Sequence, residues 1–211
     1  YFPNPVNPAI SIPLLAAVNN AAPARAFGLG FVTGFVFFFL LISWLMSTLT
    51  LYGGLPGPLS FLILFLLTAY LSLYPALFGL LVSKTALDSR AGPLWAACLW
   101  VGLEYVRTHA FTGFCWGGLG YSQTTVLPLI QISDLTGVYG VSFLLVLVNA
   151  QAARTWIRLR KDGAGAALVR TWPGWVLTLG LVATVLIYGQ VRIRTIDREA
   201  AQARTVKAAI V

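Results

Sequence analysis

The sequence predicts an all-α integral membrane protein, a polytopic helical bundle of about six membrane segments. Of its 211 residues, 58% are hydrophobic and 9% are charged, whereas soluble domains carry about 25% charged residues. Residues 26–83 contain no Asp, Glu, Lys or Arg, and about 20 apolar residues are enough for a helix to cross a bilayer. The composition therefore excludes an ordinary soluble domain.

Proline and glycine bound the first segments. Four prolines within the first 13 residues restrict any early helix to residues 6–18, as a short span or an interfacial segment. Residues 26–51 are long enough to span with some tilt, and Gly30 and Gly34 are spaced to let another helix approach closely. The glycine and proline run at 53–58 ends this helix.

Four further spans follow along the chain. Residues 59–82 form the first of them, with a kink at Pro75, and residues 94–108 form a shorter one that ends in charged residues. Residues 137–153 and 172–188 form the last two, and a basic loop separates them. With the two earlier segments, these spans make the predicted bundle.

Basic residues concentrate in alternate loops. If every segment crosses, one side receives eight cations: Arg25, Lys84, Arg90, Arg154, Arg158, Arg160, Lys161 and Arg170. Cytoplasmic loops carry an excess of Lys and Arg, so this side, with the predicted loop at 154–170, is assigned to the cytoplasm. The extracytoplasmic side receives the 53–58 turn, residues 111–137 and the C-terminal tail. Topology explains the net charge of +8, and no nucleic-acid partner is expected.

The least ordinary stretch of the chain is residues 104–123. A charge at the centre of a bilayer costs about 2.5 to 3.5 kcal/mol on insertion scales, so Glu104 is expected to pair or to face a polar cavity. Arg107 lies three residues on, which places both side chains on one face of a helix. The pair is either a structural ion pair at a helix end or part of a polar pocket that holds a lipid headgroup.

Glycines and aromatic residues fill the second half of this stretch. Four glycines after Phe111 disfavour a continued helix, because each costs about 1 kcal/mol relative to alanine. We expect a glycine- and aromatic-rich extracytoplasmic loop that folds back over the helices. Phe114, Trp116 and Tyr121 form either an interfacial aromatic belt or the lining of an acyl-chain site.

Other reactive side chains have simpler interpretations. His109 is either a general base or, with no histidine or carboxylate at relay spacing, an interfacial hydrogen-bonding group. Cys98 and Cys115 lack the spacing of a zinc site or a disulfide framework, although a thiol such as Cys115 can carry an acyl group. Ser142 and Asn149 are interpreted as helix–helix hydrogen-bonding groups. No metal cluster, phosphate-binding glycine loop or Ser/His/Asp set occurs, so no metal and no cofactor is expected.

Several runs between residues 40 and 150 resemble the membrane half of the apolipoprotein N-acyltransferases, the bacterial enzymes that complete lipoprotein maturation. The runs are Ser43-Trp44-Leu45 with Tyr52-Gly53-Gly54-Leu55-Pro56, Ala69-Tyr70-Leu71-Ser72-Leu73-Tyr74-Pro75-Ala76-Leu77-Phe78, Glu104-Tyr105-Val106-Arg107, Phe111-Thr112-Gly113-Phe114-Cys115-Trp116, Gly120-Tyr121-Ser122-Gln123 and Gly137-Val138-Tyr139-Gly140-Val141-Ser142-Phe143. The family usually has proline at the position of Cys115. This departure argues against Cys115 as the family's nucleophile.

The resemblance implies a two-step acyl transfer at the outer face of the bacterial cytoplasmic (inner) membrane. A phospholipid donates an acyl chain to an enzyme cysteine, and the resulting thioester acylates the N-terminal amine of a diacylglyceryl-cysteine on an apolipoprotein. In the family the cysteine, a glutamate and a lysine belong to a periplasmic nitrilase-like domain after the last span, so no catalytic residue is expected in this chain.

The same resemblance sets the expected organisation of this multi-pass chain. Residues 1–190 form the transmembrane domain, and residues 191–211 form a linker and the first strand of the hydrolase domain, at 206–211. Further membrane helices are expected before residue 1 and after the hydrolase domain. No signal peptide is recognised, and the natural N-terminus is expected upstream of Tyr1. The residues expected to bind lipid substrates are Glu104, Arg107, Thr112, Phe114, Trp116, Tyr121 and Gln123.

Two alternatives belong to other classes of protein. A small transporter would place its solute site at a broken membrane segment, but transporters commonly repeat that interruption in both halves. Here the interruption at 113–120 has no counterpart. The second alternative is a non-catalytic membrane scaffold related to the enzyme.

Overall fold

The structure is a computed structural model that describes residues 11–202. Every regular element within that range is helical, which confirms the all-α prediction. The α-helices are α1 (Ser11–Val18), α2 (Pro23–Ile42), α3 (Leu45–Ser47), α4 (Gly57–Ser83), α5 (Gly92–His109), α6 (Leu127–Ile130), α7 (Ser133–Thr136), α8 (Val138–Asp162) and α9 (Ala164–Gln202). A π-helical turn, η2 (Thr48–Tyr52), follows α3, and a 3-10 helix, η3 (Leu119–Gln123), precedes α6.

Four of the described helices are long and apolar enough to cross a membrane, and they are α2, α4, α8 and α9. Their exposed surfaces are rich in large apolar side chains, as expected for helices that contact lipid. The chain is therefore a helical membrane protein. Helix α5 has 18 residues and ends in charged side chains, while α1 has only 8 residues.

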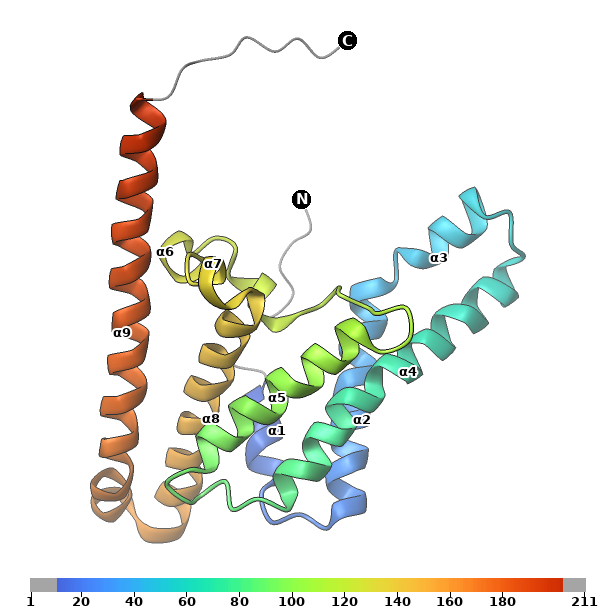
Figure 1. The fold of residues 1–211 in the computed structure, drawn as a ribbon. Helices are drawn as coiled ribbons and strands as arrows, with labels where there is room; N and C mark the ends of the chain where they lie inside the picture. Colours follow the sequence, from blue (N-terminus) through green and yellow to red (C-terminus); the bar gives the residue numbers. More distant parts are fainter. Residues whose placement is uncertain (1–10, 203–211) are drawn as a thin grey trace.

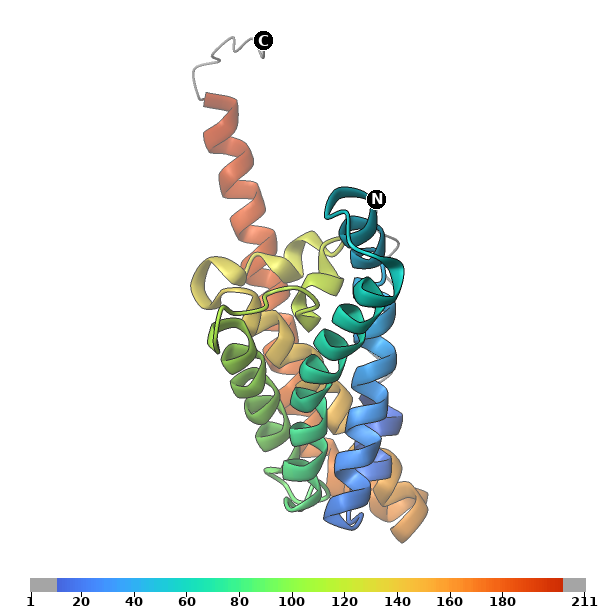
Figure 2. The same ribbon diagram turned by 90° about the vertical axis from the view of Figure 1, so that its right-hand side faces the viewer.

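Small residues bring α2 and α4 into close contact, and the two helices run side by side in both views (Figure 1 and Figure 2). A Cβ atom on Gly30 would collide with the carbonyl oxygen of Pro75, and one on Gly34 would press against the Pro75 ring. Both glycines are buried. This packing confirms the close approach that their spacing predicts.

The main hydrophobic core lies where α1, α5 and α8 meet the C-terminal part of α4. Leu15 and Val18 of α1, Phe78 of α4 and Val146 of α8 are fully or almost fully buried there. A smaller cluster around Phe38 packs α2 against α4. Helix α1 thus packs one face against the bundle through Leu14, Leu15 and Val18, while Pro13 and Ala17 are exposed. Residues 1–10 lie outside the described part of the chain.

The predicted single span at 26–51 is wrong, because the helix is broken after Ile42. Helix α2 ends there, and α3 and the π-helical turn η2 continue in a different direction (Figure 1). The hydroxyl of Ser43 donates to the Leu40 carbonyl at 3.0 Å, and that of Thr50 donates to the Met46 carbonyl at 2.9 Å. Similar bonds occur within unbroken helices, as from Ser72 to the Thr68 carbonyl in α4, so they accompany the break without explaining it. The apolar composition continues through residues 43–51, which is why hydropathy alone does not register the break.

The predicted basic loop at 154–170 is also wrong. Helix α8 continues to Asp162, α9 begins at Ala164, and the whole turn is Gly163 in the left-handed region with φ +79°. Arginine and lysine are good helix formers, and cations stabilise the last turn of a helix by compensating its dipole. The cations therefore extend the two helices instead of separating them.

Helix α9 is 39 residues long and projects beyond the other helices (Figure 1). It passes the predicted end of the last span at 188 without a break. A Cβ atom on Gly189 would collide with the Pro128 carbonyl of α6, and Asp134 of α7 accepts hydrogen bonds from Tyr188 (2.8 Å) and Arg192 (3.1 Å). The predicted strand at 206–211 lies outside the described residues.

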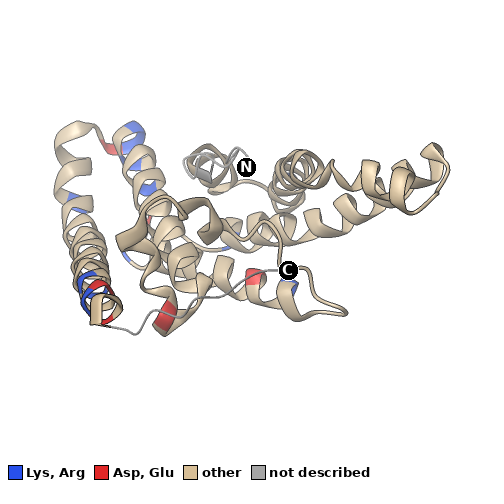
Figure 3. Ribbon diagram, turned by 90° about the horizontal axis from the view of Figure 1, so that it is seen from above, with Lys and Arg blue, Asp and Glu red and all other residues tan. Residues whose placement is uncertain are grey.

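The two ends of the bundle differ in charge. The α4–α5 loop, the end of α8 and the start of α9 meet at one end, which is the lower end in Figure 1. Seen from above, the arm formed by α3 and the start of α4 carries no Lys, Arg, Asp or Glu (Figure 3). The last turns of α5 and the segment 110–126 lie away from the basic end, toward the other end of the bundle.

Candidate functional site

Glu104 and Arg107 lie in the last turns of α5, and both are buried. Glu104 is 5% exposed and Arg107 is 4% exposed. Arg107 Nη2 lies 3.7 Å from Glu104 Oε1, so the ion pair that the spacing predicts is present. Charges without a partner are expensive inside a membrane protein, which explains why the two residues meet.

The same pair fastens the following loop to the bundle. Arg107 Nη1 donates to the Trp116 carbonyl at 2.9 Å, and Glu104 Oε1 accepts a hydrogen bond from the Leu119 backbone N–H at 2.8 Å. The Arg107 guanidinium also lies 5.3 Å from the centre of the Phe38 ring of α2, a cation–π distance. We call Glu104 and Arg107 the loop clamp.

A second anchor joins the loop to α8. The Gly120 backbone N–H donates to the Ser142 hydroxyl at 2.9 Å, and a Cβ atom at Gly120 would collide with the Val138 carbonyl. Ser142 therefore bonds to the loop backbone, and it also interacts with the Glu104 side chain of α5, which agrees with the helix–helix role that the sequence suggested. Between the clamp and this anchor, Gly113 and Gly117 adopt φ values of +74° and +75°, which favour glycine.

Aromatic side chains gather on the surface above the clamp. The Trp116 ring lies 5.1 Å from the Trp44 ring and 5.6 Å from the Phe114 ring, measured between centroids. Trp116 is 51% exposed and Trp44 is 38% exposed. Since the carbonyl of Trp116 is held by the clamp, its ring is presented outward from a fixed backbone. We call Trp44, Phe114 and Trp116 the aromatic patch.

The structure brings together four of the seven residues that the sequence assigns to lipid binding: Glu104, Arg107, Phe114 and Trp116. The other three are Thr112, Tyr121 and Gln123. Thr112 and Tyr121 are exposed, and Gln123 donates to the Ser122 hydroxyl at 3.0 Å. Within residues 11–202, none of these three side chains forms a hydrogen bond with the loop clamp.

Sequence reasoning gave no site role to Trp44 or Phe38. Phe38 lies near the end of α2 and Trp44 lies in the turn that follows it, and both are far from the loop in sequence. Trp44 occurs in one of the runs that carry the family resemblance, which is the one signal for it, but its contact with Trp116 depends on the break after α2. Phe38 lies within a long apolar run, and nothing in the sequence distinguishes it from the neighbouring residues of a membrane helix.

His109 and Cys115 lie beside the site without forming a catalytic set. The Nδ1 of His109 is 2.8 Å from the Tyr105 carbonyl oxygen, and its ring stacks on the Tyr105 ring at 4.1 Å. This contact agrees with the hydrogen-bonding interpretation. Cys115 is a free, exposed thiol. Within the described residues, no group of three His, Cys, Asp or Glu side chains is placed to hold a metal ion.

The described chain combines helices of membrane length with one buried polar site near an end of the bundle. This is a polytopic helical membrane domain with an aromatic loop clamped at one end of its bundle by a buried ion pair. The profile of the apolipoprotein N-acyltransferase N-terminal domain matches residues 3–151. The chain therefore belongs to the apolipoprotein N-acyltransferase family.

Curated relatives carry the same family name. The apolipoprotein N-acyltransferase of Geobacter metallireducens is 41% identical over 192 residues, which cover 89% of this chain and 36% of the relative. That of Rhodopirellula baltica is 35% identical over 111 residues, covering 51% and 19% of the two chains. That of Nitrosomonas europaea is 38% identical over 97 residues, covering 44% and 18%. This chain thus spans about a third of the length of the first relative and less of the other two.

Proposed function

We propose that this chain is the membrane domain of an enzyme that transfers an acyl chain from a phospholipid to the N-terminal diacylglyceryl-cysteine of apolipoproteins. The observation that carries the proposal is the family match over residues 3–151. This range includes both the loop clamp and the aromatic patch. The match favours this function over a small transporter. Catalysis itself is assigned to a nitrilase-like domain that follows residues 191–211, as in the family.

In this proposal the domain spans the bacterial cytoplasmic membrane with about six segments, four of which are the long apolar helices. The end that carries the basic residues faces the cytoplasm, because cytoplasmic loops are enriched in Lys and Arg. The aromatic patch and the C-terminal end of α9 then face the extracytoplasmic side. This orientation would deliver lipid from the outer leaflet to the catalytic domain.

The aromatic patch is proposed to contact the acyl chains of the lipid substrates, and Thr112, Tyr121 and Gln123 of the same segment are proposed as further lipid contacts. Exposed tryptophan rings offer apolar area with a polar edge, which suits the boundary between acyl chains and headgroups. Arg107 acts as a positioning residue, since its side chain is 4% exposed and bonded to Trp116 and Glu104. The clamp thus fixes the loop on which Trp116 is carried.

The test is Trp116→Ala in the full-length protein. The substitution removes the exposed ring but keeps the backbone carbonyl that Arg107 holds, so folding is expected to be near normal. Acyl-enzyme formation from labelled phospholipid should slow by about two- to tenfold, the equivalent of one aromatic contact of about 0.5 to 1.5 kcal/mol. The rate is measured as thioester formed per unit time.

Trp95→Ala provides the matched control. Trp95 is similarly exposed, at 59%, but lies at the start of α5, away from the patch. It should leave the acylation rate unchanged. Equal rates for wild type and Trp116→Ala, at equal amounts of folded protein, would show that the patch has no part in lipid use.

A further inference from the structure

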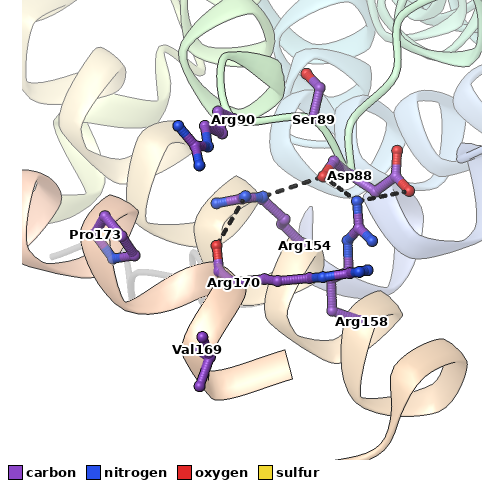
Figure 4. Close-up of a pocket in the computed structure, with 8 residues that line it drawn as sticks. All are labelled: Asp88, Ser89, Arg90, Arg154, Arg158, Val169, Arg170 and Pro173. Carbon is purple, nitrogen blue, oxygen red and sulfur yellow. Dashed lines mark hydrogen bonds and ion pairs between the residues drawn. The ribbon is translucent and has the colours of Figure 1, made fainter. Parts of the chain in front are cut away.

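A cavity of about 340 Å³ lies at the end of the bundle where the basic helix ends meet, and Figure 4 shows the side chains that line it. Its walls come from the α4–α5 loop, the end of α8 and the start of α9. The residues that line it are Asp88, Ser89, Arg90, Arg154, Arg158, Val169, Arg170 and Pro173. The volume falls within the range of about 300 to 1,000 Å³ that is typical of ligand pockets.

Four of the lining side chains are arginines and one is a carboxylate. Counting four positive charges against Asp88, the lining carries a net charge of +3. Asp162, next to the lining, pairs with Arg158 at 3.1 Å and with Arg170 at 2.9 Å, so Arg90 and Arg154 are the lining arginines without a carboxylate partner among residues 11–202. Their positive charges favour an anion in the cavity. The guanidinium group also has a planar set of donors that matches the oxygens of a phosphate. The lining therefore suits an anion with several oxygens.

Two of the arginines are held in place by backbone carbonyls. Arg154, which is 3% exposed, donates to the Asp88 carbonyl at 3.3 Å and to the Arg170 carbonyl at 3.2 Å. Arg158 donates to the Asp88 carbonyl at 3.0 Å and pairs with the Asp88 carboxylate at 3.3 Å. These contacts neutralise one arginine and leave the charge of the other in place, on a rigid frame.

Other donors in the cavity have no protein acceptor. The Nε of Arg158 is buried and makes no hydrogen bond within residues 11–202. Arg90 is exposed at the mouth of the cavity and forms neither a hydrogen bond nor an ion pair with any described residue. A buried donor without an acceptor is costly, and that cost keeps Arg158 short of full satisfaction by the protein. Arg90 is exposed and unpaired, so its whole set of donors is available to an oxygen-bearing ligand.

The cavity opens beside lipid-facing surface. Val169 lines it and is 70% exposed, and Trp172 on the next turn of α9 is 59% exposed. A headgroup bound among the arginines would therefore leave its acyl chains room along the apolar face of α9. Basic pockets between membrane helices are a known mode of anionic headgroup recognition.

We propose that this arginine cavity binds a phosphate-bearing anion. The phosphate oxygens accept hydrogen bonds from Arg90, while Arg154 and Arg158, bonded to backbone carbonyls, form a rigid and positively charged frame. The same chemistry is found in an anionic phospholipid headgroup and in free phosphate, and the experiment separates these two sources. The site lies at the far end of the bundle from the aromatic patch and stands independently of the acyl-transfer proposal.

The experiment compares wild type with Arg90→Gln in the full-length protein, purified in mild detergent. Phosphatidylglycerol and phosphatidylcholine are titrated separately, and bound lipid is counted by native mass spectrometry. Wild type should bind one phosphatidylglycerol with a lower Kd than phosphatidylcholine. Arg90→Gln should weaken the phosphatidylglycerol complex by about fivefold, the usual effect of one cation near an anionic headgroup. Since Arg90 has no protein partner, the variant should fold normally.

Arg25→Gln is the matched control, because Arg25 is an exposed cation outside the cavity. It should bind phosphatidylglycerol as wild type does.

Inorganic phosphate at constant ionic strength is the second probe. If phosphate raises the unfolding temperature of wild type and not of Arg90→Gln, while phosphatidylglycerol shows no preference, the ligand is a soluble phosphate. If neither probe distinguishes Arg90→Gln from wild type, or if Arg25→Gln has the same effect, the proposal is wrong.

Discussion

At the residue scale, the Glu104–Arg107 pair is a local feature with distant consequences. Removing both charges from water is costly, and their mutual attraction offsets that cost only when their remaining atoms are hydrogen-bonded. Here the Trp116 carbonyl and the Leu119 N–H supply two such bonds, while Glu104 Oε2 is buried without a hydrogen bond to the described residues and relies on the charge of Arg107. The charges, the loop and the exposed ring of Trp116 are therefore one cooperative unit.

The clamp makes a testable prediction about stability. Arg107→Gln alone should lower the free energy of unfolding by about 3 to 5 kcal/mol, because it leaves the Glu104 carboxylate buried without its partner. The double variant Glu104→Gln/Arg107→Gln should lose less than the sum of the two single variants. Unfolding in detergent, followed by circular dichroism, measures all three against wild type. Strictly additive losses would mean that the two charges do not interact.

The pair was predictable and the aromatic patch was only partly so. Glu104 and Arg107 are three residues apart on one helix, and helix geometry alone brings them together. Phe114 and Trp116 were identified as aromatic residues in a glycine-rich loop. The contact of Trp116 with Trp44 joins two distant segments, and neither hydropathy nor periodicity carries information about such a pair.

At the element scale, the helices whose ends are marked by glycine and proline were predicted well. Gly57–Ser83 and Gly92–His109 lie close to their expected bounds. The errors occurred where hydropathy gave no boundary and where charged residues were interpreted as a loop. The helix breaks after Ile42 within a continuous apolar run, while Arg and Lys continue α8 to Asp162. Hydropathy does not distinguish a charged helix end from a charged loop.

The contact between α2 and α4 can be tested with two neighbouring glycines. Gly30→Ala should lower the unfolding temperature, because the new methyl group would collide with the Pro75 backbone; a clash of this kind typically costs about 1 to 3 kcal/mol. Gly28→Ala meets no atom within 4 Å and should be neutral or stabilising, since alanine is favoured over glycine in a helix by about 1 kcal/mol. Equal effects at both positions, measured by thermal unfolding in detergent, would contradict this packing.

At the scale of the whole molecule, the bundle has two unlike ends. One end carries the aromatic patch on a clamped loop, and the other carries the arginine cavity and most of the cations. Four apolar helices, each long enough to cross a membrane, run along the bundle. If the acyl-transfer proposal holds, this separation places the patch in the outer leaflet, on the side where α9 leads toward the catalytic domain.

Thiol labelling of Cys115 tests this orientation most directly, since Cys115 is an exposed free thiol next to Trp116. In a Cys98→Ala background, a membrane-impermeant maleimide added to intact spheroplasts should label Cys115 without permeabilisation. A cysteine introduced by Arg25→Cys, with both native cysteines replaced by alanine, should be labelled only after the membrane is opened. The reverse pattern, with Cys115 protected until permeabilisation, would contradict the account.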